Sequence, residues 1–229
     1  MISAIIVAAG SSQRMGFDKL EADLAGLSVL ARSILAFQEC ADVSEIRVVS
    51  PKDKVTAVGQ LAEEIGADKF IEAVAGGAER HLSVWNGIRK LENSRAGLIA
   101  VHDGARPLVS PAAISACGEV ASQWGAASLA HRVTDTLKRG NAAGEVCGSV
   151  SRRNLWAMET PQIFDFGLLR EAYEKIMEEG RKVSDEASAL QAIGIKVRLV
   201  ENHDPNIKVT VPADLAIAER VLQNKAEKN

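Results

Sequence analysis

The sequence predicts a Rossmann-like α/β fold, in which a mostly parallel sheet is flanked by helices on both faces. Short apolar runs rich in β-branched residues recur along the chain, and stretches with helical spacing separate them. Strands and helices that alternate in this way fold into parallel sheets through crossover connections. The chain has 229 residues, and 47% of them are hydrophobic, so it can bury one sizeable core. We therefore expect a single domain over residues 1–229.

The expected elements alternate from the N-terminus onward. Strands are expected at residues 2–8, 45–50, 70–74, 97–102 and 197–201. Helices are expected at residues 29–41, 55–65, 82–91 and 111–123, and an amphipathic helix follows Pro212. Ligands of open α/β sheets bind beyond the carboxyl ends of the strands, so the segments that follow these strands are the expected site.

One segment interrupts this alternation. Residues 127–139 and 145–152 read as extended segments, and the sequence Gly-Asn-Ala-Ala-Gly between them has the composition of a hairpin turn. We predict a β-arm over about 127–152 that projects from the domain and serves dimerisation. An ordinary edge hairpin that packs on its own sheet is the alternative, and the pattern alone leaves it open.

Composition and charge exclude several classes of protein. A net charge of −3 gives no global attraction for nucleic acid or an anionic membrane, and no apolar run approaches the length of a membrane span. The three cysteines, Cys40, Cys117 and Cys147, lie far apart and form no CxxC pair, which argues against disulfides and a structural zinc site. We expect a soluble, cytoplasmic protein in which the cysteines are small core residues.

The loop at residues 8–16 has features of a phosphate-binding site. Its small residues let backbone amides approach an anion closely. It lacks the GxGxxG of a dinucleotide site, and no Lys-Ser/Thr pair follows Gly16 to make a Walker A loop. Arg14 and Lys19 instead supply cations that can face the phosphates. The pattern favours a nucleotide triphosphate over the alternative, a plain strand-to-helix turn with solvated cations.

Asp103 follows a strongly apolar strand, which places it at the carboxyl edge of the sheet. A carboxylate there can hold Mg²⁺, which takes carboxylate and phosphate oxygens together. The structural alternative is that Asp103 caps the following turn and pairs with Arg106. A single His beside a strand, such as His102, is more typical of a hydrogen-bonded core residue than of a metal ligand.

Several other residues are ambiguous on their own. The turn at residues 76–80, with Ser83, could read the edge of a base, and it could equally be a simple strand-to-helix turn. Arg152 and Lys208 are as single residues more typical of a solvated surface. Ser184 precedes a helical pattern and is more typical of an N-cap than of a substrate contact.

Taken together, these segments resemble the 2-C-methyl-D-erythritol 4-phosphate cytidylyltransferase family, whose members join a polyol phosphate to CTP in non-mevalonate isoprenoid biosynthesis. The matching segments are Ala8-Ala9-Gly10 with Arg14 and Lys19, Glu79-Arg80 with Ser83, HDGARP at 102–107, TDTLKR at 134–139, TPQ at 160–162, DEASAL at 185–190 and NIKVT at 206–210. The opening loop alone is similar to nucleotidyltransferases in general. The later segments are similar to this family and to its relative that activates ribitol 5-phosphate.

The resemblance implies a role for each matching residue on the nucleotide side. The residues that would surround CTP are Ala8, Ala9, Gly10, Gly76, Ser83 and Gly104. Asp103 would help to hold Mg²⁺, which the resemblance implies as the cofactor. Arg14 and Lys19 would brace the α-phosphate and act as catalytic residues.

The resemblance also implies how the acceptor is bound. Arg152 and Lys208 would position the acceptor phosphate as catalytic residues. The residues that would contact the rest of the polyol phosphate are Arg106, Thr136, Ser184 and Asp204. In the family the arm that carries the equivalents of Thr136 and Arg152 crosses to the other subunit, so a homodimer is expected.

Two alternative functions follow from the same residues. The first is a ribitol-5-phosphate cytidylyltransferase, because the later segments resemble both families. The second is a non-catalytic nucleotide-sensing module, although a sensor has no use for acceptor-side cations such as Arg152 and Lys208. A dehydrogenase is disfavoured because the glycine fingerprint is missing.

Overall fold

The computed structural model describes residues 1–10, 17–91, 94 and 96–227. The strands of the central sheet are β1 (Ile2–Val7), β4 (Val43–Ser50), β5 (Phe70–Ala75), β6 (Leu98–Asp103), β7 (Ala126–Arg132), β10 (Trp156–Asp165) and β11 (Arg198–Glu201). The helices are α1 (Val29–Glu39), α2 (Val55–Glu64), α3 (Arg80–Arg89), α4 (Pro111–Trp124), α5 (Phe166–Glu178), α6 (Glu186–Ala192) and α7 (Pro212–Ala226), and a short 3-10 helix, η1, spans Lys52–Lys54. Two short hairpins pair β2 (Asp23–Leu24) with β3 (Leu27–Ser28) and β8 (Leu137–Gly140) with β9 (Val146–Val150) within the described residues.

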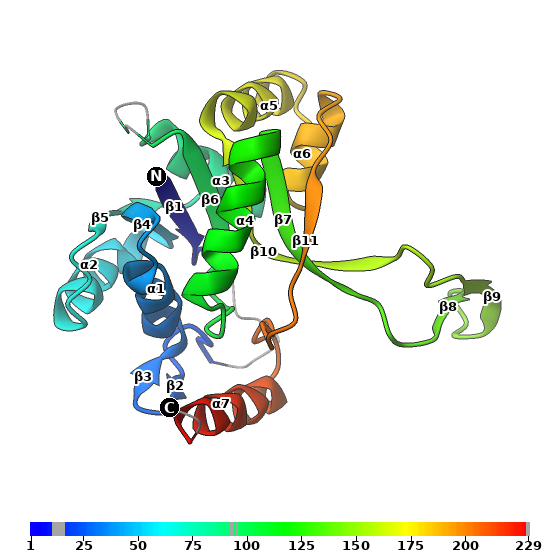
Figure 1. The fold of residues 1–229 in the computed structure, drawn as a ribbon, viewed down its shortest axis with the longest axis horizontal. Coiled ribbons are helices and arrows are strands. Elements are labelled where there is room, and N and C mark those ends of the chain that lie inside the picture. Colours follow the sequence, from blue (N-terminus) through cyan, green and yellow to red (C-terminus); the bar gives the residue numbers. More distant parts are fainter. Residues whose placement is uncertain (11–16, 92–93, 95, 228–229) are drawn as a thin grey trace.

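The central sheet has the order β11-β7-β10-β6-β1-β4-β5 (Figure 1). β1 pairs in parallel with β4 and β6, β4 pairs with β5, and β11 pairs with β7 in the same way. β10 runs antiparallel between β6 and β7. The predicted fold class, a mostly parallel Rossmann-like sheet with helices on both faces, is therefore confirmed.

The central strand β1 is buried on both of its faces, which explains its continuous apolar sequence. Side chains alternate across a strand, so Ala4 and Ile6 join the core cluster beneath α1, α2, α4 and α7, whereas Ile5 joins the cluster beneath α3, α5 and α6. All three side chains are fully buried. The sheet thus has a hydrophobic core on each side and holds the end of β1 rigidly.

Side chains just before the helices satisfy the exposed N–H groups of the first turns. Ser28 accepts from Ala31 N at the start of α1, and Ser110 accepts from Ala113 N at the start of α4. At α6 the capping residue is Asp185, which accepts from Ser188 N. The prediction that Ser184 caps this helix was therefore wrong by one position, because α6 begins at Glu186 and the residue directly before it is Asp185.

The remaining predicted elements agree with the structure apart from their ends, but one helix was missed. α5 carries Leu169, Ala172, Tyr173 and Ile176 on its buried face, at the i, i+3, i+4, i+7 spacing of an amphipathic helix. β10 is a strand of 10 residues that contains the TPQ motif at 160–162. The beginning of β10 is only partly buried and has a polar position, which hides its strand character in the sequence.

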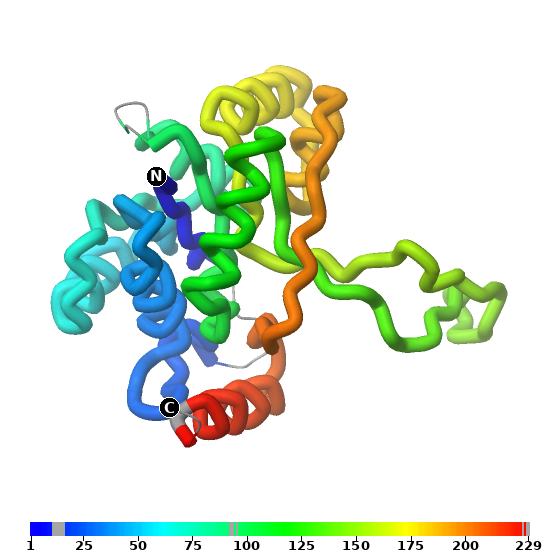
Figure 2. Tube along the Cα trace, in the orientation of Figure 1, coloured from blue at the N-terminus to red at the C-terminus, as the bar shows by residue number. Residues whose placement is uncertain are grey.

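The β8–β9 hairpin projects far from the sheet, as both the ribbon and the tube show (Figures 1 and 2). The arm begins later than predicted, because residues 126–132 form β7 inside the central sheet. Ala126 to Ala130 are all buried there, so the segment behaves as a core strand. β8 and β9 pair with each other and not with the central sheet, so the alternative of an edge hairpin packed on its own sheet was wrong.

The positions of the three cysteines and the apolar character of the helices can be compared with the expectations from composition. Cys40 and Cys117 are buried free thiols, as expected, but Cys147 is exposed. The expectation of a core position was wrong for Cys147 because it lies on β9 of the projecting arm, where there is no core to join. Among the described residues, none of the helices combines the length and apolar character needed to span a bilayer.

A matched pair of substitutions tests this account of the core. Ile5→Ala on β1 should lower the free energy of unfolding by about 2–5 kcal/mol, because it leaves a cavity in a fully buried site. Ile71→Ala on the edge strand β5 removes the same atoms from a side chain that is 53% exposed, and should cost less than about 1 kcal/mol. Urea denaturation measures both values, and equal costs would contradict the account.

Candidate active site

The candidate site lies where the parallel strands β1 and β6 end side by side, with Val7 paired to Asp103. A cavity of about 370 Å³ opens at this edge. Its lining comes from the ends of three strands, the segments that follow them and one residue near the C-terminus: Val7, Ala8, Ala9, Gly10, Lys19, Leu20, Gly77, Ala78, Glu79, Arg80, Ser83, Asp103, Ala105 and Lys208. The structure thus gathers most of the predicted nucleotide-side residues around one cavity.

The floor of this cavity depends on close backbone approach. A Cβ atom added to Gly76 would lie 2.4 Å from Ala9 Cβ and 3.0 Å from Ser83 Oγ. Gly76 N also donates to Ser50 O over 2.8 Å, which draws the turn onto the end of β4. Gly104 N donates to Val7 O over 2.9 Å. Glycine at position 76 therefore lets two strand-end turns meet beside the opening loop.

Ser83 acts within the turn that precedes α3. Its Oγ accepts from Gly77 N over 3.1 Å and donates to Glu79 O over 3.1 Å. The side chain is almost completely buried. Its hydroxyl therefore fixes the shape of the turn, and the turn presents its backbone to the cavity.

The structure places one of the two predicted phosphate-facing cations. Lys19 lines the cavity, and its Nζ donates to Val209 O over 3.0 Å. This bond links the segment after the opening loop to the segment that carries Lys208. Arg14 lies outside the described residues.

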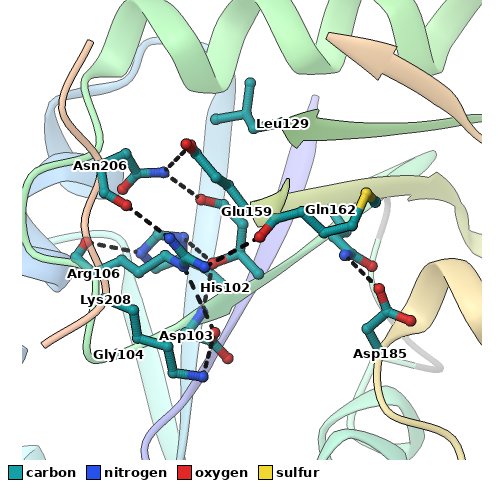
Figure 3. A network of polar contacts seen from close by, with 12 residues as sticks. His102, Asp103, Gly104, Arg106, Leu129, Glu159, Gln162, Asp185, Asn206 and Lys208 are labelled. Atoms are coloured by element: carbon teal, nitrogen blue, oxygen red, sulfur yellow. Dashed lines mark hydrogen bonds and ion pairs between the residues drawn. The ribbon is translucent and has the colours of Figure 1, made fainter. Parts of the chain in front are cut away.

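Asp103 is the centre of an ion-pair cluster (Figure 3). Lys208 Nζ donates to Asp103 Oδ2 over 2.9 Å, and Arg80 approaches Asp103 Oδ1 to 3.3 Å. Arg106 Nε lies 3.7 Å from Asp103 Oδ2. These cations come from α3, from the turn after β6 and from the C-terminal segment, so the carboxylate joins distant parts of the chain.

The cluster keeps the Asp103 carboxylate ionised. Burial by itself would raise the pKa of this carboxyl, but the charges of Arg80 and Lys208 outweigh that effect and hold the pKa well below its usual range. The side chain is only 12% exposed, so solvent screens these charges weakly. Asp103 thus presents a fixed negative charge at the edge of the cavity.

Arg80 is itself held by a second, fully buried carboxylate. Glu186, the first residue of α6, accepts from Arg80 Nη1 over 2.7 Å and from Nη2 over 3.1 Å. Tyr173 Oη donates to Glu186 over 3.0 Å. Burial would lower the pKa of Arg80, but the charges of Glu186 and Asp103 raise it. Sequence analysis assigned no role to Arg80 or Glu186, although both lie in motifs that carry the family resemblance.

His102 is a structural residue, as its position beside a strand indicated. It is fully buried, its Nε2 lies 3.1 Å from Arg106 O, and its Nδ1 lies 3.1 Å from Thr160 Oγ1. Thr160 Oγ1 also accepts from Asp103 N over 3.0 Å, so its hydroxyl proton is directed to His102 Nδ1. The imidazole therefore carries its proton on Nε2 and holds the turn from Asp103 to Arg106.

A second cavity, of about 620 Å³, adjoins the first at Lys208, which lines both. It is lined by Arg106, His131, Ala157, Met158, Glu159, Asn202, His203, Asp204, Pro205, Asn206, Ile207, Lys208 and Thr210. Three of the predicted acceptor-side residues, Arg106, Asp204 and Lys208, therefore lie together in the described part of the chain. Of these, Lys208 stands at the junction of the two cavities.

Arg106 donates hydrogen bonds to two backbone carbonyls of the protein. Its Nη1 donates to Asn206 O over 2.7 Å, and its Nη2 donates to Met158 O over 3.3 Å. Burial lowers the pKa of Arg106, and Asp103 opposes that effect. The guanidinium thus ties the segment of Lys208 to β10, and supports the wall of the second cavity.

Three predicted acceptor-side residues do not line either cavity in the described chain. Thr136 and Arg152 belong to the projecting arm, and Arg152 donates to Thr134 O within that arm. Ser184 is exposed beside α6, where its hydroxyl contacts Ser188 Oγ over 3.4 Å. The isolated chain therefore does not bring these side chains to Lys208.

The residues at the first cavity fit a metal–phosphate complex. Mg²⁺ prefers a few carboxylate oxygens together with substrate phosphates. Asp103 offers an ionised carboxylate, whereas nowhere in the described chain do three or more His, Cys, Asp or Glu side chains gather as a metal site. A cation held by Asp103 would have phosphate oxygens and water as its other ligands.

Comparison with known proteins agrees with this geometry. A family model described as 2-C-methyl-D-erythritol 4-phosphate cytidylyltransferase matches residues 2–224. A protein of that name from Caldanaerobacter subterraneus subsp. tengcongensis is 39% identical over 225 residues, covering 97% of this chain and 99% of that protein.

Solved structures share the fold over nearly the whole chain. The 4-diphosphocytidyl-2C-methyl-D-erythritol synthase of Anaerococcus prevotii has a TM-score of 0.84 and 29% identity, covering 97% of this chain and 98% of that one. The 2-C-methyl-D-erythritol 4-phosphate cytidylyltransferase of Thermus thermophilus has a TM-score of 0.77 and 33% identity, covering 97% and 100%.

The buried position of His102 predicts a pH dependence of stability. Burial lowers the pKa of His102 to about 4 in the folded protein, whereas a histidine in the unfolded chain has a pKa of about 6.5. On acidification the unfolded state therefore binds a proton at this residue before the folded state does. Stability present at neutral pH is therefore lost as the pH falls through 6.5 towards 4. Between pH 7 and pH 5 the loss from this group should be about 2 kcal/mol.

Denaturant unfolding of the wild type and of His102→Gln at both pH values measures this contribution. The variant should lose about 2 kcal/mol less than the wild type between pH 7 and pH 5. His203→Gln, at an exposed histidine, is the matched control and should keep the wild-type difference. Identical losses in all three proteins would contradict the assignment.

Proposed function

The chain belongs to the 2-C-methyl-D-erythritol 4-phosphate cytidylyltransferase family, and we propose from this premise that it joins 2-C-methyl-D-erythritol 4-phosphate to CTP. The products are 4-diphosphocytidyl-2-C-methyl-D-erythritol and pyrophosphate, in non-mevalonate isoprenoid precursor biosynthesis. The observation that carries the proposal is the pair of adjoining cavities that share Lys208, because the reaction requires two anionic substrates to meet. We further propose that residues 1–229 form one nucleotidyltransferase domain with an inserted arm, and that it works in the cytoplasm.

In the proposed arrangement the first cavity takes CTP. The backbone of Ala8, Ala9 and Gly10 receives the triphosphate, and the turn held by Gly76 and Ser83 lies beside the nucleotide. Gly104 follows Asp103 at the end of β6, and its N–H donates to Val7 O, which joins the ends of β6 and β1. Lys19, together with Arg14, stabilises negative charge that develops at the α-phosphorus.

The chemistry is an in-line attack by an acceptor phosphate oxygen on the α-phosphorus of CTP. The new P–O bond forms as the bond to pyrophosphate breaks, and the leaving group carries away the electron pair. A phosphate monoester is already largely ionised near neutral pH, so no general base is needed. Catalysis then depends on alignment and on cations that offset the repulsion between the two substrates.

We propose Mg²⁺ as the cofactor, held by Asp103 together with phosphate oxygens of CTP. When bound, the ion neutralises part of the triphosphate charge. The cations of the Asp103 cluster are held in place by the protein's own ion pairs, Arg80 and Lys208 each with Asp103. Their alignment therefore costs little at the moment of reaction.

In the second cavity, Lys208 would hold the acceptor phosphate next to the first cavity, with Arg106 and Asp204 nearby. Thr136, Arg152 and Ser184 do not line this cavity within one chain, so they can complete the proposed acceptor site only if the segments that carry them are brought to it. We therefore propose a homodimer in which the arm of one subunit brings Thr136 and Arg152 to the acceptor site of its partner. The arm projects away from the central sheet (Figure 1), and no residue of β8 or β9 is among those that line the two cavities, which supports this arrangement.

One assay separates the proposal from its alternatives. Protein, CTP and Mg²⁺ are mixed with either 2-C-methyl-D-erythritol 4-phosphate or ribitol 5-phosphate, and pyrophosphate release is measured. We expect release with the methylerythritol acceptor. Preference for ribitol 5-phosphate would indicate the related cytidylyltransferase, and silence with both acceptors would favour a nucleotide-sensing module.

Substitution of the two lysines should separate the two substrates. Lys19→Ala should lower kcat by about 10²-fold or more, as removal of a transition-state donor does. Lys208→Ala should act mainly through the acceptor and leave the affinity for CTP close to the wild-type value. Steady-state kinetics and calorimetry with CTP test this division, which fails if CTP binding collapses in Lys208→Ala.

The shared site can be tested by mixing two inactive variants. Arg152→Ala damages the arm and Lys208→Ala damages the cavity, so a mixed dimer contains one site with both groups intact. Co-expression should recover about a quarter of the wild-type activity, because half of the dimers are mixed and each has one complete site. No recovery, or a monomer by light scattering, would contradict the dimer.

A further inference from the structure

The wall of the second cavity contains a carboxylate that the reaction described above does not use. Glu159 lies on β10 and is only 4% exposed. Its Oε2 accepts from Asn202 Nδ2 over 2.8 Å and from Asn206 Nδ2 over 2.9 Å, and Figure 3 shows the bond to Asn206. Its Oε1 lies 2.6 Å from His131 Nδ1. Both oxygens are therefore engaged, and the carboxylate is held in one orientation.

His131 is the outermost member of this cluster. It lies near the end of β7, opposite Ala157 of β10, and its side chain is 54% exposed at the second cavity. The bond to Glu159 directs the proton of the imidazole to Nδ1. Nε2 has no hydrogen-bond partner in the described part of the chain. An imidazole that carries its single proton on Nδ1 presents an acceptor at Nε2.

The position of His131 relates this acceptor to the substrate. Lys208, Arg106 and His131 line the same cavity, and the first two are cations suited to a phosphate. A polyol phosphate also carries hydroxyl groups, which are donors that an imidazole nitrogen can accept. The cavity therefore offers its cations for one end of such a molecule and His131 for another.

Cross-strand pairing alone does not account for the cluster. Apolar or exposed polar side chains at positions 131 and 159 would also allow these two strands to pair. Here a carboxylate is buried, at a cost in desolvation, and is compensated by two asparagine amides. A carboxylate that accepts a hydrogen bond from one ring nitrogen of a histidine fixes the orientation of the ring and so the direction of the other nitrogen. Glu159 orients the imidazole of His131 in this way.

We propose that His131 helps to bind the acceptor by accepting a hydrogen bond from a hydroxyl group of the polyol phosphate at Nε2, and that Glu159 is the positioning residue that orients it. This inference rests on the proposed function, because it concerns the acceptor of the same reaction. It assigns a role to residues that lie outside the motifs behind the family resemblance.

Two substitutions at position 131 separate the ring nitrogens. The amide of His131→Asn can replace Nδ1 and keep the bond to Glu159, whereas the longer amide of His131→Gln can reach the place of Nε2. His131→Asn should raise the KM for 2-C-methyl-D-erythritol 4-phosphate about five- to tenfold, the value of one hydrogen bond. His131→Gln should restore most of this loss, and kcat and the KM for CTP should stay within about twofold.

Arg132→Gln is the neighbouring control. Arg132 pairs with Glu201 and stacks over Trp156, and it does not line the second cavity, so its acceptor KM should match that of the wild type.

The outcomes distinguish this inference from the proposed function. An active wild type with an unchanged acceptor KM in His131→Asn would overturn the inference and leave the proposed function standing. Equal rises in both KM values together with a lower Tm would also overturn it, by indicating a structural role. A wild type that releases no pyrophosphate with either acceptor would overturn both.

Discussion

The ion-pair cluster around Asp103 is the interaction on which the rest of the site depends. Asp103 ends β6 beside the end of β1, and Arg80 and Lys208 reach it from α3 and from the segment before α7. Glu186 then holds Arg80 from the opposite side. These pairs connect α3, α6 and the segment before α7 to the end of β6, and removal of one partner would leave a buried charge without its counterion.

The same cluster determines how the two cavities relate. Lys208 contacts Asp103 and lines both cavities, so the cation that would hold an acceptor phosphate is fixed at the edge of the first cavity, which we propose takes the nucleotide. Lys19 approaches the same segment through Val209 O. Two anionic substrates can thus be brought together by cations that are already ordered, and the carboxylates that order them prevent a purely positive, self-repelling cluster.

The fold could be predicted from the sequence because the patterns that indicate strands, helices and turns each lie within a short stretch of the chain. The apolar run of β1, the turn residues after it and the strand that delivers Asp103 can all be read within short windows. The contact between Arg80 and Glu186 joins residues 106 positions apart, so no window contains it. The beginning of the arm was misplaced for a similar reason, since β7 becomes a core strand only by pairing with β10 and β11.

The acceptor side was predicted from resemblance and not from local pattern. Lys208 and Arg152 read individually as solvated surface residues, and only tertiary structure brings Lys208 to Asp103. The cluster of His131 and Glu159 carries no signal in sequence, because its members come from separate strands and loops.

Carbon-13 NMR of the Asp103 carboxyl group, assigned with Asp103→Asn, tests the central claim directly. If Arg80 and Lys208 hold this carboxylate ionised, its resonance should show no protonation step between pH 7 and about pH 4, where an ordinary aspartate is half protonated. A midpoint near the ordinary value in the folded protein would mean that the cluster does not fix the charge, and would contradict the account.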